Sequence, residues 1–303
     1  MYLSSHSYYS LRYGTISVDN LVEEAARCGV KALALTDINN STGIMDFVAA
    51  SRVKGIQPIA GIEFRQGDEY LYTGLAKSNE GFRELNEFLS FHNLNNQPFP
   101  VRAPELDQVF WIYPFPGGET AKWRNGETAK WRNGETAKWR NGENRQPSTL
   151  DRQSWIGIRP SELSPLMLSR HRDLIPRMVL MAPVTFRNRQ EYELHCNFRA
   201  VDHNVLLSRL GPGQVAPPDE IMQPVGQLLD TCRDFPEITR NTEKIMADCS
   251  IDFDFKSCKN KKTYTGERYD DLILLEKLAM DGLQYRYGKG HAEARRRIRH
   301  ELE

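Results

Sequence analysis

Three side chains that could bind a metal ion follow short apolar segments near the start of the sequence. His6 comes after the first apolar residues, Asp37 ends the run KALALTD, and Glu63 comes at the end of GIEF. The carboxyl ends of parallel strands meet at one end of a barrel, so we expect these side chains to converge there. One imidazole and two carboxylates are a ligand set for a divalent cation whose coordination shell is completed by water.

Each of these residues also has a purely structural interpretation. Asp37 could cap the turn that follows it, and His6 could donate to a backbone carbonyl. Glu63 could pair with an arginine such as Arg65 or Arg12. For any one residue taken alone, the structural interpretation is favoured.

The other histidines and cysteines do not suggest a second centre. His195 and His203 are eight residues apart on a predicted helix, which is more than two turns and too far for one metal ion. The five cysteines contain no CxxC pair, which is typical of reduced thiols in the cytoplasm. The sequence has no P-loop, GxGxxG, GxSxG or HExxH motif.

Strands and helices alternate in the part of the chain that carries the three candidate ligands. Apolar runs predict strands over 31–36, 57–64, 70–76, 109–115, 155–160 and 177–184, and helical periodicity predicts helices over 17–28, 44–55, 82–89, 188–210 and from 236 onward. Alternation of this kind predicts an α/β fold with a parallel sheet, either open or closed into a barrel.

Three identical copies of GETAKWRN lie within 117–145. Each copy contains Asn-Gly, a strong signal for a hairpin turn, so a small meander of strands is one interpretation. We favour a duplicated surface loop, because solenoid repeats are longer than eight residues. We assign no chemical role to this segment.

The composition limits the partners of the chain. Among its 303 residues, 40 are Lys or Arg and 40 are Asp or Glu, so the whole molecule has no net field that attracts nucleic acid. The arginines within 295–299 form a local basic cluster, which we interpret first as a solvated helix face and second as a DNA-binding site. The sequence has no signal peptide and no apolar run long enough to cross a membrane, so we expect a cytoplasmic protein without membrane contact.

Two phrases in the first 90 residues point to a known family. The segments 6-HSYYSL-11 and 75-LAKSNEGFREL-85 resemble the polymerase-and-histidinol-phosphatase (PHP) domain at the N-terminus of the bacterial DNA polymerase III alpha subunit. Residues 247–255 and 269–288 resemble the segment that joins this domain to the polymerase core. The resemblance implies a distorted (β/α)7 PHP-type barrel over 1–225, with the repeat in one loop, and a mainly helical segment over 226–303 that leads toward a polymerase palm and thumb.

The resemblance also implies where ligands have been lost. Active PHP proteins hydrolyse phosphoesters at a cluster of up to three metal ions, whose ligands lie in motifs at successive strand ends. In this sequence the corresponding positions are Ser4-Ser5-His6 for His-x-His, Asp37-Ile38 for Asp-His, Glu63 for the glutamate, Leu71 for a histidine, and Pro183-Val184-Thr185 for Asp-x-His. Ligands are missing from four motifs, so His6, Asp37 and Glu63 are expected to be residual metal ligands at most.

Three functions remain open from the sequence. The first is a non-catalytic scaffold, by resemblance the N-terminal part of a polymerase III alpha subunit. Its partners would be the rest of the alpha chain, the separate proofreading exonuclease subunit and, through the parent protein, DNA. This fragment would need no cofactor beyond one weakly bound divalent metal, whereas the parent would use Mg²⁺ for nucleotide transfer. The second is a metal-dependent phosphoesterase or 3'-5' exonuclease that uses the reduced site. The third is a DNA-binding module that uses the arginines of 295–299.

Overall fold

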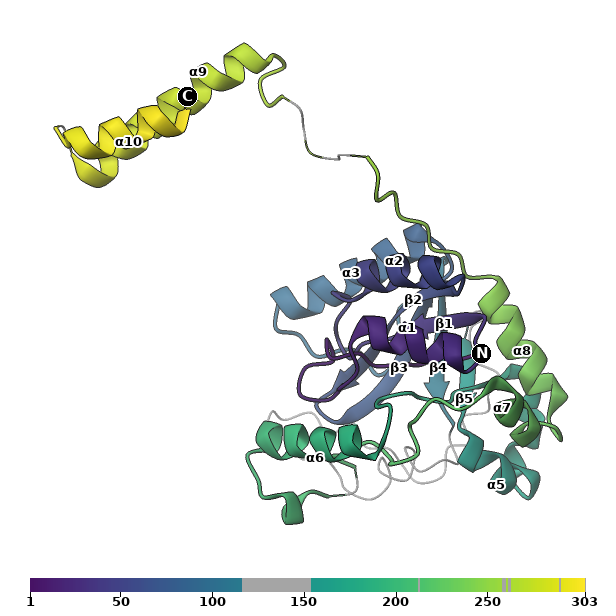
Figure 1. Cartoon of the computed structure of the whole chain (residues 1–303). Coiled ribbons are helices and arrows are strands. Elements are labelled where there is room, and N and C mark those ends of the chain that lie inside the picture. The colour runs from purple at the N-terminus through teal and green to yellow at the C-terminus, as the bar shows by residue number, and fades with distance from the viewer. Residues whose placement is uncertain (116–153, 212, 258–259, 261–262, 289, 303) are drawn as a thin grey trace. The chain divides into compact units, whose positions relative to one another are not determined.

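The computed structural model of the chain describes residues 1–115, 154–211, 213–257, 260, 263–288 and 290–302. It divides into two compact units, Met1–Phe253 and Asp254–Glu303. The GETAKWRN repeat lies outside the described residues. Both units are drawn in Figure 1.

A six-stranded mixed sheet forms the centre of the first unit. In chain order and in spatial order its strands are β1 (Ala32–Leu35), β2 (Gln57–Gln66), β3 (Glu69–Ala76), β4 (Val109–Pro114), β5 (Ser154–Ile158) and β6 (Met178–Leu180). The pairs β1–β2, β4–β5 and β5–β6 are parallel, as expected. The expectation of a parallel sheet was wrong for β3, which runs antiparallel to β2 and to β4.

The reversal at β3 has a local cause. Only Gly67 and Asp68 separate β2 from β3, and a connection this short can join antiparallel strands but cannot hold a crossover helix. Gly67 has a φ of 61°, a left-handed conformation that glycine adopts without a steric cost. The sheet therefore turns back on itself directly after the strand that carries Glu63.

The N-terminal segment links the two edges of the sheet. One parallel bridge pairs Tyr2 with Leu33 of β1, and another pairs Ser5 with Val184, just after β6. The backbone N–H of His6 donates to the Val184 carbonyl at 2.8 Å. The segment therefore closes the curled sheet, and the predicted α/β barrel-like fold is confirmed.

Helices cover the outside of this sheet (Figure 1). They are α1 (Val18–Arg27), α2 (Ile44–Lys54), α3 (Asn79–Leu94), α5 (Leu163–Met167), α6 (Arg189–His203), α7 (Val225–Thr231) and α8 (Pro236–Ala247), with 3₁₀ turns at Pro160–Glu162, Arg170–Arg177 and Leu207–Arg209. Both α1 and α2 have local caps: the Ser17 hydroxyl accepts the Asn20 N–H at the start of α1, and Gly55 ends α2 with a φ of 68°. The apolar faces of these helices and of the strands form one continuous core.

The first unit extends further along the chain than the expected boundary at residue 225. Helix α8 packs against β6, and Ile238 and Ile245 are buried in the barrel core. The Thr242 hydroxyl accepts the Leu180 N–H at 2.8 Å and so ties α8 to the strand. The helical segment that was expected to leave the barrel after residue 225 is part of it as far as Phe253, because its apolar residues complete the core.

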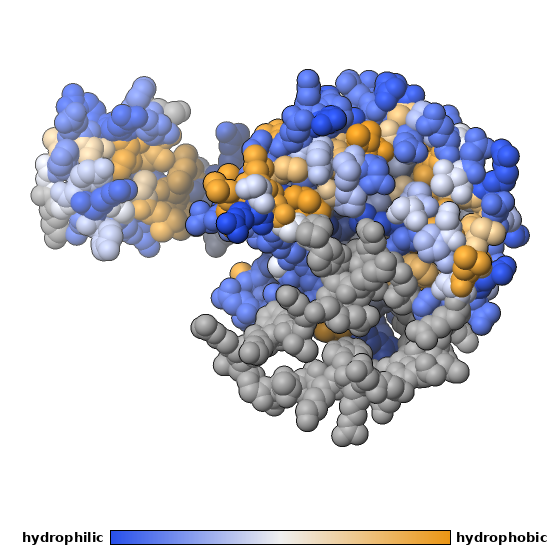
Figure 2. Space-filling model, turned by 90° about the horizontal axis from the view of Figure 1, so that it is seen from below, coloured by the Kyte–Doolittle hydropathy of each residue, from blue (hydrophilic) through white to orange (hydrophobic). Residues whose placement is uncertain are grey.

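The second unit contains α9 (Arg268–Tyr287) and α10 (Ala292–Leu302), which pack against each other. Among the described residues of these two helices, Leu283 alone is buried. Several large apolar side chains of α9 stay exposed, namely Leu272, Ile273, Leu275, Leu278 and Tyr285. Apolar surface is visible on this two-helix unit in Figure 2. No helix within the described ranges is long and apolar enough to cross a membrane.

Candidate functional site at the mouth of the barrel

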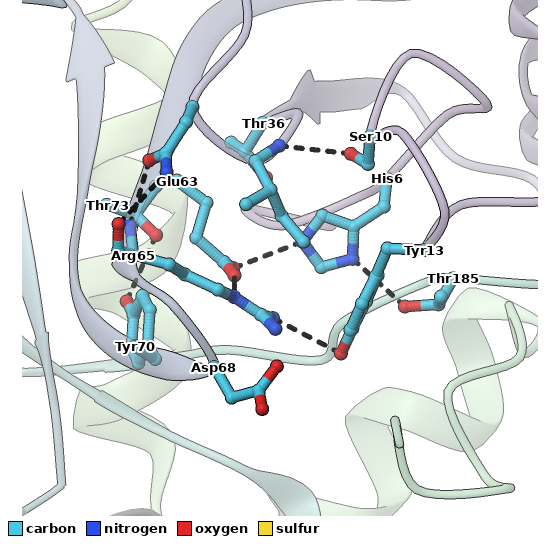
Figure 3. A network of polar contacts seen from close by, with 12 residues as sticks. His6, Ser10, Tyr13, Thr36, Glu63, Arg65, Asp68, Tyr70, Thr73 and Thr185 are labelled. Carbon is cyan, nitrogen blue, oxygen red and sulfur yellow. Dashed lines mark hydrogen bonds and ion pairs between the residues drawn. The ribbon is translucent and has the colours of Figure 1, made fainter. Parts of the chain in front are cut away.

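His6 and Glu63, two of the three predicted ligands, are in direct contact (Figure 3). The Nε2 atom of His6 lies 3.1 Å from the Oε2 atom of Glu63, and both side chains are buried. Glu63 lies within β2 and not at its end, since the strand continues to Gln66 to pair with β3. The backbone of Asp37 is also adjacent, because its carbonyl accepts the Glu63 N–H at 3.2 Å.

The carboxylate of Asp37 is held by the loop that follows the N-terminal segment. Its Oδ1 atom accepts the Ser7 N–H at 2.7 Å and the Ser10 hydroxyl at 2.6 Å, and its Oδ2 atom accepts the Ser7 hydroxyl at 2.7 Å. Burial raises the pKa of Asp37 above its ordinary value, against the opposing effect of these donors. The interpretation of Asp37 as a cap for the following turn was wrong: Ser7 and Ser10 are its partners.

Glu63 pairs with Arg65, one of the two arginines proposed for it. The Arg65 Nε atom donates to Glu63 Oε1 at 2.5 Å, and its Nη2 atom donates to the Tyr13 hydroxyl at 3.2 Å. Burial alone would raise the pKa of Glu63, but Arg65 and His6 outweigh it and lower this pKa to about 2. Both carboxylate oxygens of Glu63 are therefore engaged by protein groups.

The strand geometry explains why Arg65 reaches Glu63. Alternate residues of a strand point to the same side of the sheet, so residues 63 and 65 share a face. Opposite them, Thr73 pairs with Glu63 and Tyr70 pairs with Arg65, which leaves Leu71 as an extra residue in β3.

The Asn39 side chain holds the backbone at the same point. It accepts the Arg65 N–H and donates to the Arg65 carbonyl, both at 2.9 Å. The position of the arginine is thus set by its backbone as well as by its ion pair.

The Nδ1 atom of His6 is linked through Thr185 to a second ion pair, which Glu220 forms with Arg159. His6 Nδ1 lies 2.9 Å from the Thr185 hydroxyl, which donates in turn to Glu220. Arg159 Nη1 donates to the other oxygen of Glu220 at 2.9 Å. The interpretation of His6 as a donor to a backbone carbonyl was wrong, since both of its ring nitrogens contact side chains.

Sequence reasoning missed Glu220, Arg159 and Tyr13. Arg159 directly follows β5, so the rule that selected Asp37, a polar residue just past a strand, could have found it. Glu220 lies in an irregular segment and Tyr13 in a loop, and no local pattern marks either of them.

Ile38 occupies the position next to Asp37 where the family resemblance implies a histidine. Its side chain packs against a small apolar cluster of Tyr13, Phe186 and Ala216. Ile38 therefore adds apolar bulk next to Asp37.

The two histidines that were judged too distant to share a metal ion have separate partners. The His195 Nδ1–H donates to the Tyr13 carbonyl at 2.7 Å, and its Nε2 atom accepts the Ala216 N–H at 2.8 Å. Burial lowers the pKa of His195 to about 4, so the ring is neutral at pH 7. The Nε2 atom of His203 lies 3.2 Å from the Oδ2 atom of Asp68. Within the described ranges, no group of three or more His, Cys, Asp or Glu side chains is arranged to hold a metal ion.

Comparison with known proteins defines the class of this fold. Residues 3–112 match the family model of the PHP domain. This match covers the N-terminal segment and strands β1 to β4, including His6, Asp37 and Glu63. This part of the chain is therefore similar to the PHP domain, as its motifs predicted.

Bacterial DNA polymerases are among the proteins that this chain is similar to. The chain is 26% identical to the error-prone DNA polymerase of Symbiobacterium thermophilum over its full length and 30% of that protein. It is 25% identical to the DNA polymerase III subunit alpha of Bacillus subtilis over its full length and 28% of that protein. The subunit alpha of Escherichia coli is 38% identical over 37% of this chain and 10% of that protein. These matches confirm the resemblance to polymerase III alpha subunits, of which the chain spans less than a third.

Proposed function

We propose that this chain is the PHP region of a bacterial DNA polymerase of the polymerase III alpha or error-prone type, and that its barrel is a non-catalytic scaffold. The observation that carries the proposal is the state of Glu63, whose two carboxylate oxygens contact Arg65 and His6. The similarity of the full chain to such polymerases supports the parentage.

The residues at the barrel mouth do not fit a metal cluster. A hydrolytic centre with several metal ions needs free anionic ligands to neutralise the ions and to hold a reactive water. Here both oxygens of Asp37 accept hydrogen bonds from Ser7 or Ser10, and a guanidinium lies against Glu63, where it would repel a cation. We therefore derive no hydrolytic step from these residues.

In this proposal the barrel supports the rest of the polymerase chain and offers a surface to a separate proofreading exonuclease subunit. DNA contact and nucleotide transfer with Mg²⁺ belong to the parent protein, in the cytoplasm. The exposed apolar face of α9 is compatible with further protein packing against it.

Metal analysis tests the proposal against the alternative of a phosphoesterase or 3'-5' exonuclease with a reduced site. The chain should be purified without chelator, and zinc, manganese and iron should be measured beside activity on a single-stranded oligonucleotide and a chromogenic phosphodiester. We expect metal well below one ion per chain and no activity above that of Glu63→Ala. Near-stoichiometric metal and activity, both lost in Glu63→Ala, would establish the alternative.

A second experiment tests the scaffold role in the full-length polymerase. Thr242→Val destabilises the barrel without touching the mouth, so we expect it to shorten the half-life of polymerase activity at elevated temperature while the initial rate at low temperature stays the same. Thr242→Ser is the matched control, because it keeps the hydroxyl. Equal half-lives for the wild type and Thr242→Val, in a protein whose barrel is measurably destabilised, would contradict a supporting role.

A further inference from the structure

The guanidinium of Arg65 lies between Glu63 and Tyr13 in the polar network of Figure 3. Its Cζ atom is 4.4 Å from the centroid of the Tyr13 ring, and its side chain is 12% exposed. A carboxylate buried in a protein is stabilised by a nearby positive charge or by several hydrogen-bond donors. In this barrel a side chain of the same strand supplies that charge.

The second ion pair of the network has the same composition. Glu220 is buried, and its charge is balanced by Arg159, whose side chain is 27% exposed. Thr185 and His6 connect this pair to Glu63. Glu63 and Glu220 thus each have an arginine partner, and His6 and Thr185 join the two ion pairs.

Two atoms of the predicted ligands His6 and Glu63 already have a spacing that suits one metal ion. His6 Nε2 and Glu63 Oε2 are 3.1 Å apart. Two donor atoms that bind the same ion at right angles, with bonds of about 2.1 Å, lie about 3 Å from each other. A cation could bridge them with little movement once the competing positive charge was gone.

We propose that Arg65 is a built-in counter-cation that takes the place of a metal ion at Glu63, and that its removal opens a site for one divalent cation between His6 Nε2 and the Glu63 carboxylate. The inference rests on the proposed non-catalytic role of the barrel. Arg65 is thus a positioning residue, since this arginine acts by holding Glu63 in its ionised, buried state.

The proposed compensation of the Glu63 charge by Arg65 can be tested by thermal unfolding of the full chain. Arg65→Met keeps an aliphatic stem beside Tyr13 but leaves Glu63 uncompensated, so we expect the melting temperature of the barrel to fall by about 10 °C. The double variant Arg65→Met/Glu63→Gln removes both charges and should recover more than half of this loss. The matched control is Arg83→Met, because Arg83 pairs with Glu80 and Glu87 on the exposed face of α3. This control should shift the melting temperature by less than about 2 °C. A double variant no more stable than Arg65→Met would overturn the counter-cation role.

The cation site can be tested with Mn²⁺ alone. For Arg65→Ala, Mn²⁺ at about 100 times its dissociation constant should raise the melting temperature by about 5 °C or more, and electron paramagnetic resonance should count one bound ion per chain. Wild type and Arg65→Ala/Glu63→Ala should show neither effect. If Arg65→Ala is insoluble, Mn²⁺ in the growth medium should restore soluble protein only when Glu63 is present.

The outcomes separate this inference from the proposed function. No response of Arg65→Ala to Mn²⁺, or an equal response of the double variant, would overturn the latent cation site and leave the scaffold proposal standing. A wild-type chain that binds Mn²⁺ through Glu63 would contradict the scaffold proposal itself.

Discussion

An ion pair of the barrel and an ion pair of the two-helix unit differ widely in their exposure to solvent. In the barrel, Arg65 and Glu63 form an ion pair in which the side chains are 12% and 6% exposed. In the two-helix unit, Arg297 and Glu301 are 80% and 64% exposed and lie 3.4 Å apart. A buried pair is costly to break because one charge stays behind in the interior, whereas an exposed pair is screened by water. Substitutions at the buried ion pairs of the barrel should therefore have large effects, and those at exposed pairs small ones.

The helical glycines of the two units offer the sharpest test of this contrast. A Cβ atom at Gly81 in α3 would lie 1.9 Å from the backbone carbonyl oxygen of Gln108. The helix would have to move away from β4, so Gly81→Ala should lower the free energy of unfolding by about 3 kcal/mol or more. Urea unfolding followed by circular dichroism measures this change. A loss below about 1 kcal/mol would mean that α3 is not tightly docked.

Acid should weaken the barrel through His195. Because the pKa of this ring is lowered from 6.5 to about 4, the unfolded chain binds more protons than the folded one between these values. This stability is fully present above about pH 6.5 and is lost as the pH falls toward 4, by up to about 3 kcal/mol. Urea unfolding at a series of pH values measures it.

His195→Gln is the control for this titration, because an amide can donate to Tyr13 and accept from Ala216 without titrating. Its stability should be nearly flat across the window. Below about pH 4.5 both proteins should lose further stability, because Glu63 binds a proton in the unfolded chain with its ordinary pKa of 4.5, whereas in the folded chain this pKa is lowered to about 2. A wild-type profile as flat as that of the variant would contradict the assignment of a neutral buried ring.

The attachment of α8 to the barrel should depend on one hydroxyl. Thr242→Val keeps the shape of the side chain but leaves the buried Leu180 N–H without its acceptor. We expect a loss of about 2 kcal/mol in the free energy of unfolding, while Thr242→Ser should lose less. Equal losses in the two variants would mean that packing of the methyl group, and not the hydrogen bond, holds the helix.

The smallest change in the free energy of unfolding is expected in the two-helix unit, where the substitution should be stabilising. Gly282 lies inside α9, and a Cβ atom there would have no neighbour within 4 Å. Gly282→Ala should stabilise the unit by about 0.5–1 kcal/mol through helix propensity alone. Hydrogen exchange of the α9 amides measures this gain. A destabilised α9 would show that the helix surface at Gly282 is closely packed and would weaken the contrast with the barrel.

Local patterns in the sequence were enough for most elements and for the class of the fold. The helices predicted over 17–28 and 44–55 are α1 and α2, whose ends are set by the local caps Ser17 and Gly55, since capping depends on residues within one turn. The polar residues His6 and Glu63 were correctly expected to come together. The metal role of these residues and of Asp37 stays a prediction.

Only the tertiary structure decided how the charges at the barrel mouth are balanced. Arg65 and Arg12 were equal candidates for Glu63 in the sequence, but only Arg65 lies two residues away on the same strand and points to the same side. Thr185, which His6 contacts, is 179 residues further along the chain. Such pairs depend on strand register and on closure of the sheet by the N-terminal segment. The packing of the whole barrel sets both the register and the closure. Helices and strands, in contrast, begin and end where a few neighbouring residues dictate.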